Sequence, residues 1–148
     1  MARGVALKRR FPHVQTTAHR VRYGETDRMG VVYYAHYFAW FEAGRGDYLR
    51  ELGADYRMLE EGRGVFIPVL EASAKYRRGA EFDDVVLIAT SIEEANRVRL
   101  RFSYEVHRQS DGELLASGST IHAAVGRDGR ARPMPRELLR LIPIDEGD

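Results

Sequence analysis

Residues 20–52 read RVRYGETDRMGVVYYAHYFAWFEAGRGDYLREL, and this stretch decides the fold. In its second half, large apolar residues recur three, four and seven positions apart, which predicts a helix with one broad aromatic face ending at Gly53. Gly44 and Gly46 lie inside this helix, where each costs up to ~1 kcal/mol relative to Ala, so we expect a wrapped sheet to bring another backbone close. The residues of the apolar face are Tyr34, Tyr37, Phe38, Phe41, Tyr48, Leu49 and Leu52.

The sequence on either side of this helix has the pattern of strands and turns. Residues 14–23 alternate in character up to Gly24, which predicts a first strand, and a loop over residues 24–32 leads into the helix. A short second helix is predicted over residues 54–61, where it meets two glycines. The period then changes to that of four further strands, at residues 65–76, 84–94, 97–108 and 114–125.

The predicted strand at residues 97–108 shows the alternation most clearly. Its apolar positions predict one core face and one polar face, and the short linkers at residues 94–97 and 109–112 predict hairpins between antiparallel neighbours. A short helix over residues 136–141, stopped by Pro143, closes the chain. The predicted class is α+β, with a five-stranded antiparallel sheet packed on one long helix. The apolar positions of the alternating strand are Val98, Leu100, Phe102, Tyr104 and Val106.

Length and composition favour one domain, with boundaries at residues 14–142, between a basic tail at residues 1–13 and a C-terminal tail at residues 143–148. The chain has no cysteine, and its five histidines lack the spacing of a zinc motif, so we expect no disulfide and no metal. A net charge of +1 gives little reason to expect nucleic acid as a partner. No signal peptide or membrane span is recognisable, and a cytoplasmic protein is expected.

Asp27 stands in the loop directly before the long helix. A short acid in this place commonly accepts backbone N–H groups in an N-cap or Asx turn, and that is its structural interpretation. Its functional interpretation is a carboxylate that acts as nucleophile or general base beside helix-start N–H groups able to polarise a carbonyl. The loop by itself leaves both open.

The longer string RVRYGETDRMGVVYYAHYFAWFEAGR resembles the signature of the 4-hydroxybenzoyl-CoA thioesterase family and its YbgC-like acyl-CoA thioesterase branch, which belong to the hotdog-fold superfamily. The resemblance combines a T-D-x-x-G-x-V-Y core, an aromatic run and an F-E-x-x-R segment. Later strings, KYRRGAEFDD, SGSTIHAAV and GRARPMP, are also similar to family segments, so the resemblance spans residues 14–141.

This resemblance implies a hotdog fold, in which the sheet wraps around a central helix, and hydrolysis of an acyl-CoA thioester with a small aromatic or short-to-medium acyl group. The family's catalytic Asp falls on Asp27, and the N–H that binds the thioester oxygen falls on Tyr34 or a neighbour. The family's loop residues Gly30, Val32 and Tyr33 are expected at the substrate. No cofactor is implied, since CoA is part of the substrate.

Tyr34 departs from the YbgC-like branch, which commonly has His at this position, whereas the 4-hydroxybenzoyl-CoA branch has Tyr. A backbone N–H donor does not depend on the side chain, so the oxyanion role survives the change. A side-chain acid/base role for that His does not carry over. His36 is not its equivalent, and its interpretations are a solvated or capping residue or one that faces the pocket.

The remaining charged residues have mainly structural interpretations. Glu42 stands three residues before Arg45, which favours an ion pair, and Asp83 and Asp84 are typical of a turn into a strand. The phosphates of CoA require cations, and loop-borne arginines are favoured for them over those of the sheet face. The favoured set is Arg77, Arg78 and Arg132, and the other candidates are Arg97, Arg99 and Arg130.

Two other functions stay open at this level. A hotdog hydratase or dehydratase would need an acid paired with a His, and no matching downstream His motif is present. A non-catalytic acyl-CoA binding or sensor module would not need a carboxylate beside the thioester. The resemblance also implies a homodimer with a continuous sheet and sites at subunit boundaries, with further assembly into a homotetramer, a dimer of dimers.

Overall fold

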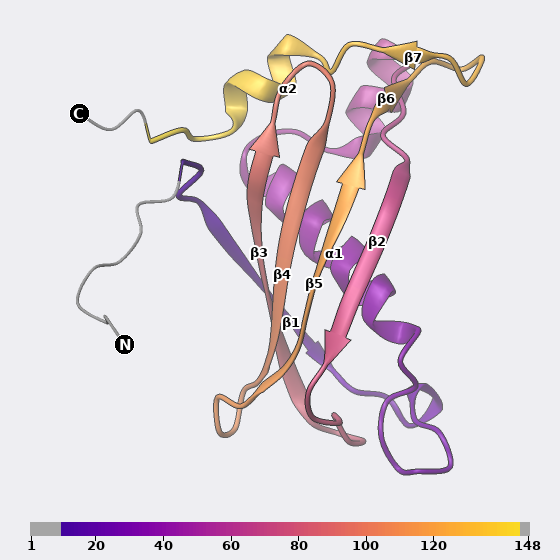
Figure 1. Cartoon of the computed structure of the whole chain (residues 1–148), viewed down its shortest axis with the longest axis vertical. Coiled ribbons are helices and arrows are strands. Elements are labelled where there is room, and N and C mark those ends of the chain that lie inside the picture. The colour runs from indigo at the N-terminus through magenta and orange to yellow at the C-terminus, as the bar shows by residue number, and fades with distance from the viewer. Residues whose placement is uncertain (1–9, 146–148) are drawn as a thin grey trace.

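The computed structural model describes residues 10–145, and its central feature is one long helix held against one face of an antiparallel sheet (Figure 1). The five strands have the order β1-β3-β4-β5-β2, so the sequence prediction of a five-stranded antiparallel sheet on a dominant helix is confirmed. Two short strands form a second, two-stranded sheet.

The strands and helices follow the predicted order. The strands are β1 (Val14–Arg20), β2 (Val69–Tyr76), β3 (Val85–Ala95), β4 (Leu100–Arg108), β5 (Leu114–His122), β6 (Ala124–Val125) and β7 (Ala131–Arg132). The helices are α1 (His36–Glu51) and α2 (Arg136–Leu141), with a 3-10 turn η1 (Tyr23–Glu25) and a π-helical segment η2 (Met58–Arg63). Both predicted hairpins are present, because β3 pairs with β4 and β4 with β5.

Several boundaries differ from the sequence prediction: the strand predicted at residues 65–76 begins at Val69, the helix predicted at residues 54–61 appears as η2 (Met58–Arg63), and the strand predicted at residues 114–125 is divided into β5 and β6. Three further differences have clear structural causes or consequences. The first strand ends at Arg20, because the chain turns into η1. The fourth begins at Leu100, because the Asn96 side chain accepts the amides of Val98 and Arg99 in the hairpin, which leaves Val98 71% exposed and not in the core. The long helix begins at His36, so Tyr34 precedes it and is 57% exposed instead of joining the apolar face.

The core forms between α1 and the inner face of the sheet. Tyr48 and Leu49 of the helix are fully buried, and Phe41 stacks on Tyr104 of β4 with ring centroids 4.3 Å apart. Such pairs add about 0.5–1.5 kcal/mol beyond the burial of their area. Phe11, which the sequence placed in the basic tail, is also buried in this core. Residues 1–9 of that tail and residues 146–148 of the C-terminal tail lie outside the described residues.

The two helix glycines serve different purposes. A Cβ on Gly44 would overlap the Thr90 hydroxyl and approach Ile88 Cγ2 at 3.2 Å, so the helix lies tight against β3 at this point. The close neighbours are side chains of the sheet, not the backbone that we expected. A Cβ on Gly46 would meet the flexible guanidinium of Arg50 at 3.3 Å, so no close approach by the sheet explains that glycine.

A polar cluster interrupts the core near the C-terminal half of α1. The buried Arg45 guanidinium donates to the Tyr104 hydroxyl at 3.5 Å, and Tyr104 and His122 each contact the Thr120 hydroxyl, at 2.6 and 2.8 Å. Burial, and secondarily the charge of Arg45, lowers the pKa of His122 to about 4. His122 is therefore neutral near pH 7 in the folded protein.

Replacing Gly44 with Ala should lower the free energy of unfolding by about 1–3 kcal/mol, because the new methyl group overpacks the contact with Thr90. Gly46→Ala is the matched control, and it should be neutral or stabilising by up to ~1 kcal/mol, through helix propensity. Urea unfolding followed by circular dichroism measures both. Equal effects at the two positions would contradict the tight contact at Gly44.

The buried His122 should make stability depend on pH. Its pKa is lowered on folding, so its contribution is fully present above the unfolded value of 6.5 and is lost as pH falls toward about 4. The loss should be on the order of 3 kcal/mol. Urea unfolding at pH 7 and pH 4 should show a larger loss for the parent than for His122→Gln, which has no titrating group there. The same loss in both proteins would show that His122 does not carry it.

Candidate active site

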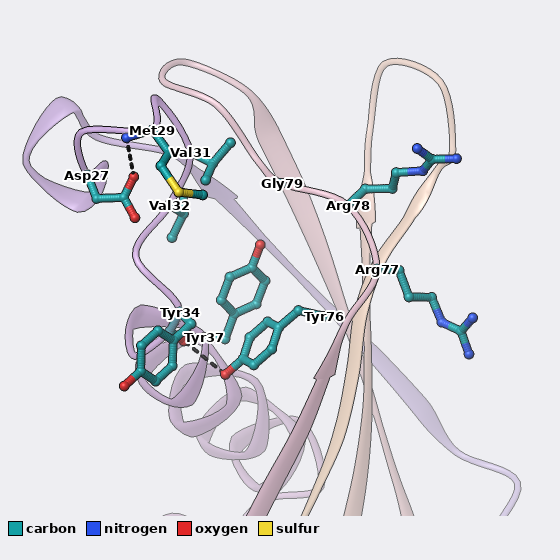
Figure 2. Close-up of a pocket in the computed structure, with 10 residues that line it drawn as sticks. All are labelled: Asp27, Met29, Val31, Val32, Tyr34, Tyr37, Tyr76, Arg77, Arg78 and Gly79. Atoms are coloured by element: carbon teal, nitrogen blue, oxygen red, sulfur yellow. Dashed lines mark hydrogen bonds between the residues drawn. The ribbon is translucent and has the colours of Figure 1, made fainter.

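A groove opens where the loop before α1 meets the end of β2 (Figure 2). Its volume is about 410 Å³, and one wall comes from the loop and helix start while the other comes from the end of β2 and the turn after it. The lining residues are Asp27, Met29, Val31, Val32, Tyr34, Tyr37, Tyr76, Arg77, Arg78 and Gly79.

Asp27 is exposed at the rim of this groove and forms an Asx turn, since its Oδ1 accepts the Met29 amide at 2.8 Å. It does not cap α1, because Ala35 occupies the N-cap position and no side chain caps the helix. Within residues 10–145, no hydrogen bond engages Asp27 Oδ2. The structural interpretation as an Asx turn is thus correct, yet it uses one carboxylate oxygen and leaves the other available.

The loop that carries Asp27 is closed by backbone pairing. Thr26 and Val32 form an antiparallel bridge, and the Val32 amide donates to the Ala80 carbonyl at 2.8 Å. Gly30 has φ +81°, a left-handed conformation that glycine adopts without strain, so the loop can reverse within a few residues. Asp27 is therefore presented on a short reversal of defined shape.

Gly79 lets the opposite wall approach this loop. A Cβ at Gly79 would lie 2.8 Å from Val31 Cβ, closer than side chains tolerate. The turn after β2 therefore packs directly on the loop, and the two walls of the groove stay in contact at one end.

The first amides of the helix region are hydrogen-bond donors that an anionic oxygen could use where they have no partner in the chain. The amides of His36 and Tyr37 bond back to the Tyr33 and Tyr34 carbonyls at 3.0 and 3.3 Å. The amides of Tyr34 and Ala35 make no hydrogen bond to another group in the part of the chain that the structure describes. Unpaired amides at a helix start carry partial positive charge and favour an oxygen that gains negative charge.

Two tyrosines shape the interior of the groove, and the sequence had not marked either as a site residue. Tyr76 Oη donates to the Tyr34 carbonyl at 3.1 Å, and its ring lies 5.1 Å from that of the buried Tyr37 (Figure 2). Burial raises the pKa of both phenols, so both stay protonated near pH 7. The available signals were the spacing of Tyr37, three residues after Tyr34, and the place of Tyr76 directly before Arg77.

The predicted site residues are only partly brought together. Asp27, Val32, Tyr34, Arg77 and Arg78 line the groove, whereas Gly30 and Tyr33 belong to the same loop without lining it. Figure 2 shows the guanidinium groups of Arg77 and Arg78 pointing away from Asp27. Arg78 pairs with Glu113 at 3.4 Å.

Arg132 lies elsewhere. It belongs to β7, at the opposite end of the sheet from the Asp27 loop (Figure 1), and pairs with Asp128 at 3.5 Å. It lines a second cavity of about 550 Å³, together with Leu70, Arg97 and Arg99. Within one chain, Arg132 and Asp27 therefore do not share a site.

The other charged candidates have structural contacts. Glu42 lies 3.9 Å from Arg45, and the Asp84 carboxylate accepts the Glu81 amide at 2.9 Å and pairs with Arg108. Asp83 has φ +72° and an exposed pair with Arg20. His36 is partly exposed at the helix start, with its ring facing Tyr33 rather than lining the groove.

Neither a metal-binding cluster nor a membrane-spanning helix is found among the described residues. Among residues 10–145, no three acidic or histidine side chains gather as metal ligands would. None of the helices in this range combines the length and the apolar character needed to cross a membrane.

Comparison with known proteins places this chain in one family. The family model described as "Thioesterase-like superfamily" matches residues 21–142. The acyl-CoA thioesterase YbgC of Haemophilus influenzae is 31% identical over 121 residues, which cover 80% of this chain and 87% of that protein.

Solved structures are similar to this chain over most of its length. The protein TT1821 of Thermus thermophilus has a TM-score of 0.80 at 39% identity, covering 86% of this chain and 96% of that one. A mutant 4-hydroxybenzoyl CoA thioesterase, crystallised with 4-hydroxybenzoyl CoA, has a TM-score of 0.81 at 26% identity, covering 88% and 99%. The chain belongs to the thioesterase-like superfamily and has its hotdog fold.

Proposed function

We propose that this acyl-CoA thioesterase binds its thioester in the groove between the Asp27 loop and the end of β2, and that Asp27 supplies the reactive carboxylate. The observation that carries the proposal is that Asp27 and Tyr34 line the same groove, with one Asp27 carboxylate oxygen and the Tyr34 amide making no hydrogen bond within the described residues. An acid and N–H donors on one cavity are what acyl transfer requires.

The chemistry has two steps under either role of the acid. The Tyr34 or Ala35 amide donates to the thioester oxygen as it gains negative charge, and CoA departs as thiolate. As nucleophile, Asp27 forms an acyl-aspartyl anhydride that water then cleaves to the free acid. As general base, it takes a proton from water as the water oxygen attacks the carbonyl carbon, and it then returns that proton to the CoA thiolate, which regenerates the carboxylate. Both routes need the same placement of acid and amides.

The walls of the groove suit a small aromatic or a short-to-medium acyl group. Tyr37 and Tyr76 present ring surfaces, and Val31, Val32 and Met29 supply the aliphatic part of the lining. Aromatic side chains bind flat rings by offset or edge contacts. The complex of the 4-hydroxybenzoyl CoA thioesterase mutant with 4-hydroxybenzoyl CoA supports an aromatic acyl group for a relative of this fold.

The alternatives fit the groove less well. A hydratase or dehydratase pairs its acid with a His, and none of the residues that line the groove in the described chain is a His. An acyl-CoA sensor needs no carboxylate beside the thioester, so Asp27 favours turnover over binding alone. Turnover assays separate these functions.

We further propose that two chains pair through the edge strand β2 and complete each other's sites. Seven of its eight residues are exposed, including Val69 and Leu70 at 43% and 59%. An uncovered edge with apolar side chains invites pairing with another strand. The dimer would then form a tetramer by a second contact, in the reducing cytoplasm that a cysteine-free chain suits.

Antiparallel pairing of two β2 strands has a consequence for the site. It places the Leu70 end of one strand beside the Tyr76 end of the other. The cavity with Arg97, Arg99 and Arg132 would then lie next to the partner's groove and could receive the CoA phosphates, while the acyl group stays near Asp27. Guanidinium groups bind phosphates through charge-assisted, often bidentate hydrogen bonds.

The substitution Asp27→Asn tests the reactive acid. Asn can keep the Asx turn to the Met29 amide, so only the charge is lost. We expect kcat for acyl-CoA hydrolysis to fall by about 10²–10⁴-fold, with little change in KM or stability. CoA release over a panel of aromatic and aliphatic acyl-CoA esters measures turnover.

The matched control is Asp55→Asn. Asp55 also accepts a backbone amide, that of Met58 at 2.7 Å, but it does not line the groove. It should retain the parental kcat. Near-parental turnover by Asp27→Asn would contradict the role assigned to Asp27. If the parent binds the acyl-CoA esters of the panel without turnover, a sensor is favoured.

Subunit mixing tests the shared site. Arg132→Ala should raise KM for acyl-CoA by roughly 10-fold or more through the loss of a charge-assisted hydrogen bond. Co-expressed, differently tagged Asp27→Asn and Arg132→Ala chains should form dimers with one intact site, and hence about half the parental kcat per dimer at the parental KM. The shared site would be contradicted if light scattering showed a monomer at micromolar concentration, or if the mixed dimers did not recover the parental KM.

A further inference from the structure

Glu25 is a buried acid two residues before Asp27, and the chemistry above does not use it. Its side chain is among the few charged groups in the core, at 5% exposed. Three donors converge on its carboxylate. Oε1 accepts the Arg22 amide at 2.8 Å and His19 Nε2 at 2.9 Å, and Oε2 accepts Trp40 Nε1 at 3.1 Å. The Arg22 guanidinium also lies 3.9 Å from Oε1, so the carboxylate meets N–H groups from each of these residues.

The three donors come from three different parts of the fold. His19 belongs to β1, Arg22 precedes η1, and Trp40 lies in the second turn of α1. One carboxylate thus joins the sheet, the start of the loop and the helix. His19 and Trp40 also contact each other, with ring centroids 5.2 Å apart.

The backbone of Glu25 holds the far end of the same loop. Its carbonyl accepts the Tyr33 amide at 2.9 Å. The segment from Thr26 to Val32, which presents Asp27, is therefore closed at Glu25 on one side and at Tyr33 on the other. Tyr34, whose amide makes no hydrogen bond within the described residues, is the next residue. Asp27 and the Tyr34 amide are consequently both fixed relative to Glu25.

Glu25 can accept all three hydrogen bonds only as an anion. Burial by itself raises the pKa of Glu25, but the hydrogen bonds from the Arg22 amide, His19 and Trp40 outweigh it and hold that pKa below its usual value. A carboxylate accepts hydrogen bonds at both oxygens. A Gln side chain would turn one N–H₂ toward these N–H donors and leave at least one of them unpaired.

We propose that Glu25 is a positioning residue for thioester hydrolysis, which holds the Asp27 carboxylate and the Tyr34 amide at a set separation by joining β1, the loop and α1. This inference rests on the proposed function, in which Asp27 is the reactive acid. Misplacement of reacting groups by about 1 Å can cost roughly 10²-fold in rate, which is the scale of effect expected.

Asp47 supplies the matched control. Its carboxylate also ties β1 to α1, because it accepts the Thr17 hydroxyl at 2.7 Å, and it pairs with Arg50. It makes no contact with the loop in the described chain. A general loosening of helix and sheet should appear in Asp47→Asn, whereas loss of loop placement should appear only in the Glu25 variants.

The test is a double-mutant cycle on kcat with Glu25→Gln, Asp27→Asn and the double variant, assayed by CoA release. Glu25→Gln should lower kcat by about 10–100-fold and change KM by less than about threefold, since the loop's placement and not substrate affinity is lost. Because part of the effect of Glu25 acts through Asp27, the double variant should lose less kcat than the product of the two single losses. Asp47→Asn should keep the parental kcat.

Three milder variants provide a second test if Glu25→Gln folds poorly. Trp40→Phe removes one N–H donor while retaining a buried ring, and it should lower kcat by a smaller factor. His19→Gln retains a donor to the carboxylate and should restore most of the kcat that His19→Ala loses. Melting temperatures confirm that the proteins compared are folded.

The outcomes are distinct. Parental kcat in folded Glu25→Gln, or in both Trp40→Phe and His19→Ala, would overturn the positioning role. So would a double variant whose loss is the product of the two single losses, because Glu25 would then act independently of Asp27. Near-parental turnover by Asp27→Asn would overturn the proposed function and, with it, this inference.

Discussion

The contact between α1 and the inner face of the sheet is the constraint on which the other features depend. At Gly44 the helix comes so close to Thr90 and Ile88 of β3 that a side chain would not fit. Close packing of this kind has few alternative arrangements, because interiors are as dense as organic crystals. It sets the position of α1 over the strands, and with it the place where the helix begins relative to the end of β2.

The site follows from that placement. The helix starts beside Tyr76, whose hydroxyl bonds the Tyr34 carbonyl, and the loop before it is pinned to the turn after β2 by the Val32–Ala80 hydrogen bond. Asp27 is exposed and stabilised by its own Asx turn, so its position costs little stability. The packing of the fold therefore orders the groove, while the loop contributes an exposed acid and amides that make no hydrogen bond within residues 10–145.

The two acids Glu25 and Asp27 differ in burial and in the number of hydrogen bonds that they accept. Glu25 is buried and saturated with donors, which are the properties of a group that holds others in place. Asp27 is exposed, with one oxygen engaged, as a group that must meet a substrate would be. Because the acids are two residues apart, only a short segment of backbone separates the buried acid from the exposed one. The two ends of the edge strand β2 also differ. One end lines the groove, and the other leaves apolar side chains exposed.

The sequence by itself determined the order and type of the main elements, the two hairpins, and the family through the T-D-x-x-G-x-V-Y string. These are local properties, because helix and strand periodicity and tight turns depend on residues close in the chain. Only the tertiary structure decided which distant residues meet. The pairing of β2 with β5 and the packing of α1 brought Tyr37 and Tyr76 together and left Arg132 in a separate cavity. Likewise, the hairpin at Asn96 exposed Val98, although its place in the alternation predicted a core position. Such long-range contacts follow from strand order and close packing, which periodicity does not encode.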